Sequence, residues 1–412
     1  MAFEGNFPII ITPTPTCKVV LFQGGLNDNG TGFDTTIDLL LQSPQGTSKF
    51  IKYEQILDMR NLDPVTHTFA ANNGNNDGYT HILSEYHFHS VVEDVVNLGR
   101  ANSDKIVLVR TCVNRVYLSN TNFLDTIENQ KFKLKYIIDE FTEYENVEIV
   151  LVGHSQGGLV NLEAAIDRCS RISKIISIST PYSPVYLANV ASFFDPLLEY
   201  IPNVDDIEYY RACINTLASN DYFSNLKSRW NALQNRPELT AIVGIAGKLQ
   251  YLSGELFDIV DIEGFDGLVM ISEQTDIEHA SFVYSINNDV PCYNNQLYSS
   301  TCCTEINNTC KNTCNLIKLS FFDFIIKLLP DILNELVHPS DNGGENSSGE
   351  TDSNSFLNII SNTAYSNNPN EAENIDPNDP YYNYLMVYAN PNSHGIIRYN
   401  ANTISKLIEL FE

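Results

Sequence analysis

The segment that constrains the fold of this chain most is VEIVLVGHSQGG, residues 147–158, in which a serine stands between two glycines directly after an apolar run. The apolar residues 149–152 are mostly β-branched, as expected of a parallel strand that is covered on both faces. Residues 159–166 then continue with helix-forming side chains. Ser155 is therefore predicted to lie on a sharp turn from a buried strand to a helix.

The residues around this serine suit a turn that exposes a nucleophile. Gly153 and Gly157 stand two residues before and after Ser155, where side chains would collide with the strand and the helix. The amides at the start of the helix point at the serine. The N–H of Gln156 can therefore stabilise an oxyanion that forms there.

His154 and Gly158 complete the sequence GHSQGG. In this setting the segment resembles the nucleophile elbow of the α/β-hydrolase superfamily, and within it the lipases and esterases that carry GHSQGG. Four further segments along most of the chain share the resemblance, whereas residues 285–380 have no counterpart in it. The resemblance implies an α/β fold with a doubly wound, mostly parallel sheet, an inserted helical cap or lid, and here a second, cysteine-rich insertion.

The hydrophobic pattern along the chain independently favours such a sheet, because apolar runs alternate with segments of helical periodicity. Sheets of this kind place their chemistry at the carboxyl ends of the strands. Besides the elbow, we expect strands at 18–22, 105–109, 174–179, 241–245 and 384–389, helices at 89–98, 122–144 and 402–410, and a strand with a hairpin-like excursion within 33–81.

The same pattern divides the chain into a core and two insertions. The expected core segments are 1–182, 239–284 and 381–412, with a cap or lid at 183–238 and a cysteine-rich, low-complexity insertion at 285–380. The aromatic residues of 183–238 suit a lid over the active site, or alternatively a packed core. Within the second insertion, 319–337 reads as an apolar helix that packs on the body or forms a second lid.

A serine alcohol needs a histidine to take its proton and a carboxylate behind that histidine. In the resembled fold the three residues follow in the order serine, acid, histidine. The sequence GFDGLV at 264–269 fits the pattern that bears the acid in similar lipases, so the resemblance implies Asp266. Asp258, Asp261 and Glu263 lie close by as alternatives, and a glycine after an aspartate is also an ordinary turn.

For the base, the resemblance requires a histidine near the end of the fold. His394 lies after the expected strand 384–389 and before the closing helix 402–410. His279 is its rival, although its position soon after Asp266 favours a structural or cap-facing role. His154 is expected to shape the elbow. The remaining candidates are interpreted as surface or packing residues rather than metal ligands: His81, His87 and His89.

The loop after the strand 18–22 has the sequence QGGLND at 23–28. By the resemblance this loop supplies the second oxyanion N–H from Leu26, while Gly24 and Gly25 let the backbone approach the substrate. Many relatives carry His-Gly where this chain has Gly24-Gly25, so Gly25 and Leu26 are both kept as candidate donors beside Gln156. Without the resemblance, two glycines after a strand are equally consistent with a tight turn.

The net charge of -27 with 24 Lys+Arg argues against binding to nucleic acid or to an anionic membrane surface. We expect an acyl ester or lipid substrate, with at most transient contact with a lipid interface. No apolar run reaches the length of a transmembrane helix, and residues 1–16 do not have the pattern of a secretion signal. The localisation stays open between cytoplasmic and, after removal of a leader, extracellular.

The chain has nine cysteines. Cys17, Cys112, Cys169 and Cys213 are scattered and are expected to be buried thiols. The other five crowd into 292–314 without C-x2-C pairs, which favours local disulfides or free thiols over a zinc site. No metal and no cofactor is expected, and the many acidic residues single out no calcium site.

Together these residues predict a serine hydrolase that cleaves carboxylic esters through an acyl-enzyme, of lipase type. A phospholipase or an acyltransferase would use the same triad, as would a peptidase, thioesterase or amidase. A protein of a different class, which binds ligands on a hydrolase scaffold without turnover, is the remaining alternative.

Overall fold

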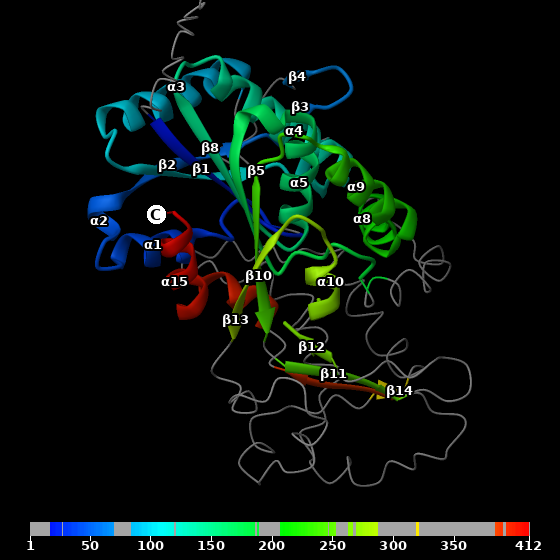
Figure 1. Ribbon diagram of the computed structural model, residues 1–412. Coiled ribbons are helices and arrows are strands. Elements are labelled where there is room, and N and C mark those ends of the chain that lie inside the picture. Colours follow the sequence, from blue (N-terminus) through cyan, green and yellow to red (C-terminus); the bar gives the residue numbers. More distant parts are fainter. Residues whose placement is uncertain are drawn as a thin grey trace, which may run out of the picture.

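The computed structural model describes residues 17–26, 28–69, 84–118, 121–185, 188, 207–245, 247–252, 263–266, 269–286, 319–320, 384–389 and 393–411. Figure 1 shows one large twisted sheet with helices on both faces and a smaller sheet beyond one end of it. The large sheet carries the elbow.

The large sheet has seven strands in the order β13-β10-β9-β8-β1-β5-β2, and every neighbouring pair is parallel. Its strands are β1 (Cys17–Gln23), β2 (Phe50–Asp58), β5 (Ile106–Cys112), β8 (Val147–His154), β9 (Ile172–Ile178), β10 (Glu238–Ile245) and β13 (Ser281–Ile286). The prediction of a parallel, doubly wound α/β sheet is confirmed.

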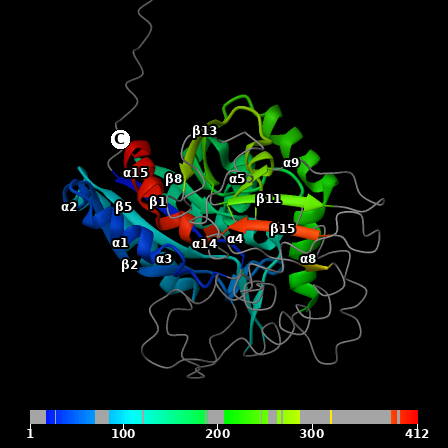
Figure 2. The ribbon, with the colours of Figure 1, turned by 90° about the horizontal axis from the view of Figure 1, so that it is seen from below.

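Two hydrophobic clusters hold helices against the two faces of this sheet. Alternate residues of β1 point into opposite clusters, Val19 and Leu21 into one and Val20 and Phe22 into the other. Seen from below (Figure 2), α15 (Ala401–Leu410) lies beside α1 (Asp34–Gln42) on one side of the sheet, and α9 (Asn220–Ala232) lies beside α5 (Gln156–Arg168) on the other. One cluster contains α3 (Glu85–Ala101), α4 (Ile127–Thr142) and α5 (Gln156–Arg168), and the other contains α1 (Asp34–Gln42) and α15 (Ala401–Leu410).

The chain leaves the central strands in opposite directions. After β1 it passes to α1 on one face, whereas after the neighbouring strand β8 it passes to α5 on the other face. The loops at the carboxyl ends of β1 and β8 lie at this change of direction, which is where sheets of this kind bind their ligands. Ser155 and the loop after β1 stand at this point.

A second, antiparallel sheet gathers strands from three of the expected segments, in the order β12-β11-β15-β14. Its strands are β12 (Glu263–Phe265), β11 (Gly247–Leu252), β15 (Tyr384–Ala389) and β14 (Leu319–Ser320). The strand expected at 384–389 forms, but in this sheet. Leu319 and Ser320 pair with β15 and are not helical, so the helix expected over 319–337 is wrong at its start; the rest of that segment lies outside the described residues.

Two other predicted elements differ in extent or content from the elements of the structure. The helix expected at 122–144 begins only at Ile127, because Thr126 caps it by accepting from Asn129 N–H at 3.3 Å and residues 121–124 form β7 (Thr121–Leu124) against β6 (Arg115–Leu118). The excursion expected within 33–81 contains α2 (Gly46–Lys49), β2 and the hairpin of β3 (Leu62–Asp63) and β4 (Thr68–Phe69). Residues 70–81 of that excursion are not described.

Of the expected cap, 183–238, the structure describes residues 183–185, 188 and 207–238, which include α8 (Ile207–Ala218) and α9 (Asn220–Ala232). Phe223 and Trp230 of α9 are buried in the cluster that contains α5, so these aromatic side chains belong to a packed core. Cys17, Cys112 and Cys213 are buried free thiols as predicted, and Cys169 is half-buried. The cysteines of 292–314 lie outside the described residues.

Candidate active site

Ser155 connects β8 to α5 with a strained backbone. Its φ of 54° and ψ of -127° lie in a region that residues with a side chain rarely occupy, at a cost of about 1–3 kcal/mol. The surroundings hold it there, since Ser155 N–H donates to the oxygen of Ile178 at 2.9 Å and Ser155 O accepts from Gly158 N–H at 3.1 Å. The sequence expectation of a strained strand-to-helix turn is met.

The glycines of the elbow are required by close backbone contacts. A Cβ added at Gly153 would lie 2.6 Å from the nitrogen of Gly158. At Gly157 it would lie 2.3 Å from the oxygen of Gly24. Real Cβ atoms do not approach other atoms this closely, so the start of α5 packs directly on the strand and on the loop after β1.

The loop after β1 reaches the serine. A Cβ added at Gly25 would stand 3.0 Å from Ser155 Cβ, and 3.2 Å from the main-chain oxygen of His154. Gly25 therefore lies beside the nucleophile, and Leu26, its half-buried neighbour, follows it. Of the two candidate donors of this loop, the structure thus places Gly25 directly against Ser155, and Leu26 is the next residue in the chain.

Asp266 and His394 meet in a buried pair. His394 Nδ1 lies 2.8 Å from Asp266 Oδ2, and Asp266 Oδ1 accepts from the N–H of Val269 at 2.9 Å. Both side chains are buried. The other ring nitrogen, His394 Nε2, is buried too and has no hydrogen-bond partner among the described residues. This nitrogen is thus available to exchange a proton.

His154 fastens the His394 segment to the elbow. Its Nε2 lies 2.8 Å from the main-chain oxygen of His394, and the two rings are 4.6 Å apart. Burial, with the neighbouring His394 and Arg398 as smaller causes, holds the pKa of His154 well below its usual value. His154 is therefore neutral and donates its Nε2–H to His394.

The other candidate histidines and acids are not brought to this site. His279 is exposed and lies 4.0 Å from Glu278. His89 pairs with Glu140 at 2.8 Å on the outer side of α3. Candidates that lie outside the described residues, or whose side chains do, are His81, Asp258, Asp261 and Glu263. In the described part of the chain no three His, Cys, Asp or Glu side chains are grouped as metal ligands would be.

Two residues that sequence reasoning missed connect this loop to the segment that carries His394. Asp28 caps the loop by accepting from the N–H groups of Gly30 and Gly32 at 2.8 and 3.0 Å. The guanidinium of Arg398 lies 4.0 Å from the Asp28 carboxylate. Burial lowers the pKa of Arg398. Arg398 stands four residues after His394, a spacing that carries no motif, so no sequence signal could have found this pair.

A third missed residue is Asn114, which follows β5. Its buried side-chain amide donates to the oxygen of Gly25 at 2.8 Å. An asparagine after a strand is too common to single out from sequence.

The chain is similar to solved structures over about two thirds of its length. A lin2722 gene product from Listeria innocua is 14% identical, with a TM-score of 0.36 over 66% of this chain and 84% of that one. A mature lipase of Bacillus licheniformis is 12% identical, with a TM-score of 0.34 over 67% of this chain and 85% of that one. A monoacylglycerol lipase of Paleococcus ferrophilus is 11% identical, with a TM-score of 0.32 over 66% and 86%.

No family model and no curated protein matches the chain. Among the described residues, no helix is both long enough and apolar enough to span a membrane. Because the superpositions are partial, the fold is assigned from the protein's own strands and turns. The parallel, doubly wound sheet and the strand–Ser155–helix turn at its carboxyl edge are the features expected of an α/β-hydrolase fold.

Proposed function

We propose that this protein is a serine hydrolase of lipase type that cleaves carboxylic esters through an acyl-enzyme. The observation that carries the proposal is a strained Ser155 together with the buried His394–Asp266 pair. His154, the neighbour of Ser155, contacts the main-chain oxygen of His394, and His394 Nε2 has no hydrogen-bond partner among the described residues. A buried histidine backed by a carboxylate is what a serine nucleophile requires.

The reaction follows from these positions. Ser155 Oγ attacks the ester carbonyl and its proton passes to His394 Nε2, while Asp266 stabilises the imidazolium through Nδ1–H. The N–H groups of Gln156 and of the loop at Gly25 and Leu26 hold the oxyanion. His394 then gives the proton to the leaving alcohol, and a water activated by the same nitrogen releases the acid and frees Ser155.

The proposed substrate is a neutral or apolar acyl ester, because a chain of net charge -27 repels anionic surfaces. A phospholipase or an acyltransferase would use the same residues and differ in the head group or in the acceptor. The competing function from another class is ligand binding without turnover.

Labelling with a fluorophosphonate probe tests the proposal, with Ser155→Ala as the matched variant. We expect the wild-type protein to label and the variant to remain unlabelled while keeping the same melting temperature. Hydrolysis of p-nitrophenyl esters of increasing acyl length then separates esterase from lipase. An added alcohol acceptor separates hydrolase from acyltransferase by the yield of the new ester. A folded wild type that does not label, even with detergent present, would sink the proposal in favour of the binding protein.

A further inference from the structure

The orientation of the peptide between Gly25 and Leu26 is set from the side away from the nucleophile. In the sheet, β1 lies between β8, which ends at the nucleophile, and β5, which leads to Asn114. The oxygen of Gly25 accepts from Asn114 Nδ2 at 2.8 Å, and also from Asp28 N–H at 3.3 Å. The carbonyl of this peptide is thus turned toward the β5 side.

A trans peptide is planar, so its C=O and N–H point in opposite directions. The described peptides include no cis bond. With the Gly25 carbonyl bound to Asn114, the Leu26 N–H is directed toward the β8 side, where Ser155 lies. Leu26 N–H has no acceptor elsewhere in the described part of the backbone, so it is available to a ligand.

We propose that Asn114 is a positioning residue of the oxyanion hole: by binding Gly25 O it aims the Leu26 N–H at the oxyanion formed on Ser155. This inference rests on the proposed function and adds a residue to it. Asn114 does not touch the reacting atoms, so its effect is transmitted through one peptide plane.

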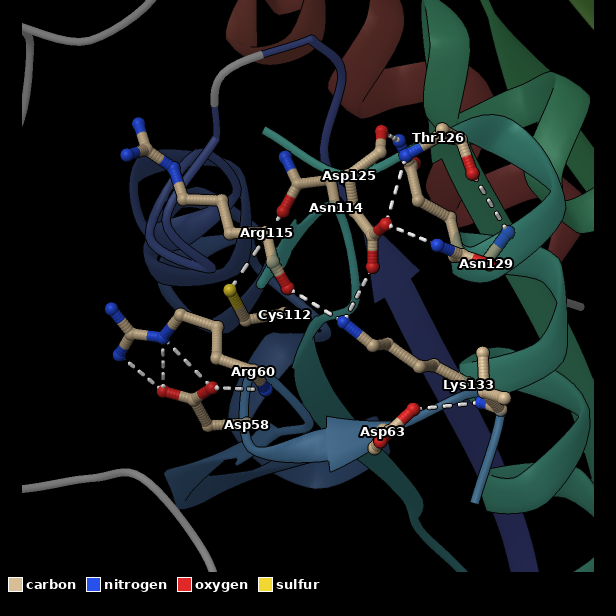
Figure 3. Close-up of polar contacts among 12 residues, drawn as sticks. Asp58, Arg60, Asp63, Cys112, Asn114, Arg115, Asp125, Thr126, Asn129 and Lys133 are labelled. Carbon is tan, nitrogen blue, oxygen red and sulfur yellow. Dashed lines mark hydrogen bonds and ion pairs between the residues drawn. The ribbon is translucent and has the colours of Figure 1, made fainter. Parts of the chain in front are cut away.

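A buried network holds Asn114 in place (Figure 3). Its main-chain oxygen accepts from Asp125 N–H at 2.8 Å. The Asp125 carboxylate binds Lys133 Nζ at 2.6 Å, and Lys133 also donates to the oxygen of Arg115 at 2.8 Å. Both charged side chains are fully buried, so water does not compete for these contacts. These contacts hold the main chain at Asn114 and at the next residue, Arg115.

The same network reaches the second oxyanion donor. Gln130 Nε2 donates to the oxygen of Asp125 at 2.7 Å and lies 3.4 Å from Gln156 Oε1. Gln156 is the residue whose N–H begins α5. The N–H groups of Leu26 and Gln156 follow different strands, β1 and β8. Both are nevertheless linked by hydrogen bonds to the same residue, Asp125.

The test compares Asn114→Ala with the wild type and with Ser285→Ala. Ser285 makes a buried contact with Thr403 at 2.7 Å on the edge strand β13, so its variant controls for the loss of a buried polar contact. We expect Asn114→Ala to lower kcat about tenfold or more with little change in KM, because an oxyanion donor is worth about 10²–10³ in rate and a misaligned one keeps part of it. Ser285→Ala should keep wild-type kinetics.

A trifluoromethyl ketone gives a readout that a structural role would not change. Ser155 Oγ adds to its carbonyl and the proton passes to His394, which leaves a hemiketal oxyanion in the hole. Affinity for this ketone should fall in Asn114→Ala by the same factor as kcat/KM, whereas affinity for the matching alcohol, which bears no oxyanion, should stay unchanged. Equal losses for ketone and alcohol would overturn the inference.

Asn114→Asp keeps the volume of the side chain, and it replaces Asn114→Ala in the test if the alanine variant does not fold. A protonated carboxyl can donate to Gly25 O and an ionised one cannot, and burial raises the pKa of such a group. The kcat/KM of this variant relative to wild type should therefore rise as the pH falls from about 9 to about 6. A flat ratio would count against the inference. A wild type that neither hydrolyses esters nor binds the ketone refutes the proposed function itself, whereas an active wild type matched by Asn114→Ala refutes only the role of Asn114.

Discussion

The residue before the nucleophile and the residue proposed as the base are joined through the main chain: His154 Nε2 lies 2.8 Å from the carbonyl oxygen of His394, 240 positions further along the chain. Because this contact uses the backbone of His394, it leaves the His394 ring free to pair with Asp266 on one nitrogen. It sets where the other nitrogen stands relative to Ser155.

Replacement of His154 should therefore act on catalysis. We expect His154→Phe to lower kcat about tenfold, since small displacements of a catalytic group cost up to about a hundredfold. His154→Gln keeps a side-chain N–H donor and should retain more of the rate. Steady-state kinetics of both variants give the comparison, and equal losses in the two would show that ring packing, not the hydrogen bond, matters.

The stability of the fold should also respond to His154 at acid pH. Its pKa is lowered in the folded protein, mainly by burial and to a smaller extent by the neighbouring His394 and Arg398. Below about pH 6.5 the unfolded chain binds the proton more readily, so the stability that neutral His154 contributes is fully present above that pH and is lost as the pH falls. Urea unfolding near pH 8 and near pH 5 should show a larger loss for wild type than for His154→Phe. The opposite ranking would contradict this assignment.

Asp266 is expected to matter for rate and not for the fold of the elbow. Asp266→Asn keeps the shape of the side chain but favours the wrong tautomer of His394, so kcat should fall about 10⁴-fold. Single-turnover acylation with a p-nitrophenyl ester measures the step. A variant with near wild-type acylation would mean that another carboxylate supports the histidine.

Alanine substitutions at Gly157 and at Gly158 should damage the protein for different steric reasons. A Cβ at Gly158 would lie 1.9 Å from Thr180 Oγ1, a side-chain atom, whereas a Cβ at Gly157 would meet the main-chain oxygens of Gly24 and Gln23 at 2.3 and 2.4 Å. Thr180→Ala should therefore partly restore the melting temperature of Gly158→Ala. No side-chain replacement can relieve Gly157→Ala, which we expect to displace the oxyanion loop and lose activity. Recovery of Gly157→Ala by Thr180→Ala would refute this distinction.

The Lys133–Asp125 pair should be costly to break on one side. Lys133→Met leaves the Asp125 carboxylate buried with only its N–H donors from Thr126 and Asn129, and should destabilise the protein by about 3–5 kcal/mol. Adding Asp125→Asn removes that charge and should recover part of the loss. Chemical denaturation of the single and double variants measures both, and additive losses would argue against a coupled pair.

The local features of the site could be predicted from sequence because each rests on neighbours in the chain. The run of β-branched residues before Ser155, the glycines beside it and the helix after it are short-range signals. The pairing of Asp266 with His394 was accessible only through the resemblance to lipases, since 128 positions separate the two residues.

What the sequence could not provide are the contacts that depend on strand order. Nothing in residues 106–112 indicates that β5 lies between β1 and β2 and so places Asn114 against Gly25. The link from Asp28 to Arg398 is of the same kind. Likewise, a strand at 384–389 was foreseeable from its apolar pattern, whereas its partner β11 in a separate sheet was not.

The attachment of the segment that carries His394 to α1 and to the elbow has a consequence for the order in which the chain folds. Thr36 in α1 donates to the oxygen of Arg398 at 3.1 Å, across 362 positions. During synthesis the parallel strands up to β10 are already available to pair when this segment is still inside the ribosome. We therefore expect the turn at Ser155 to form before residues 393–411 dock, and the proposed reactivity of Ser155 to appear only after His394 has docked.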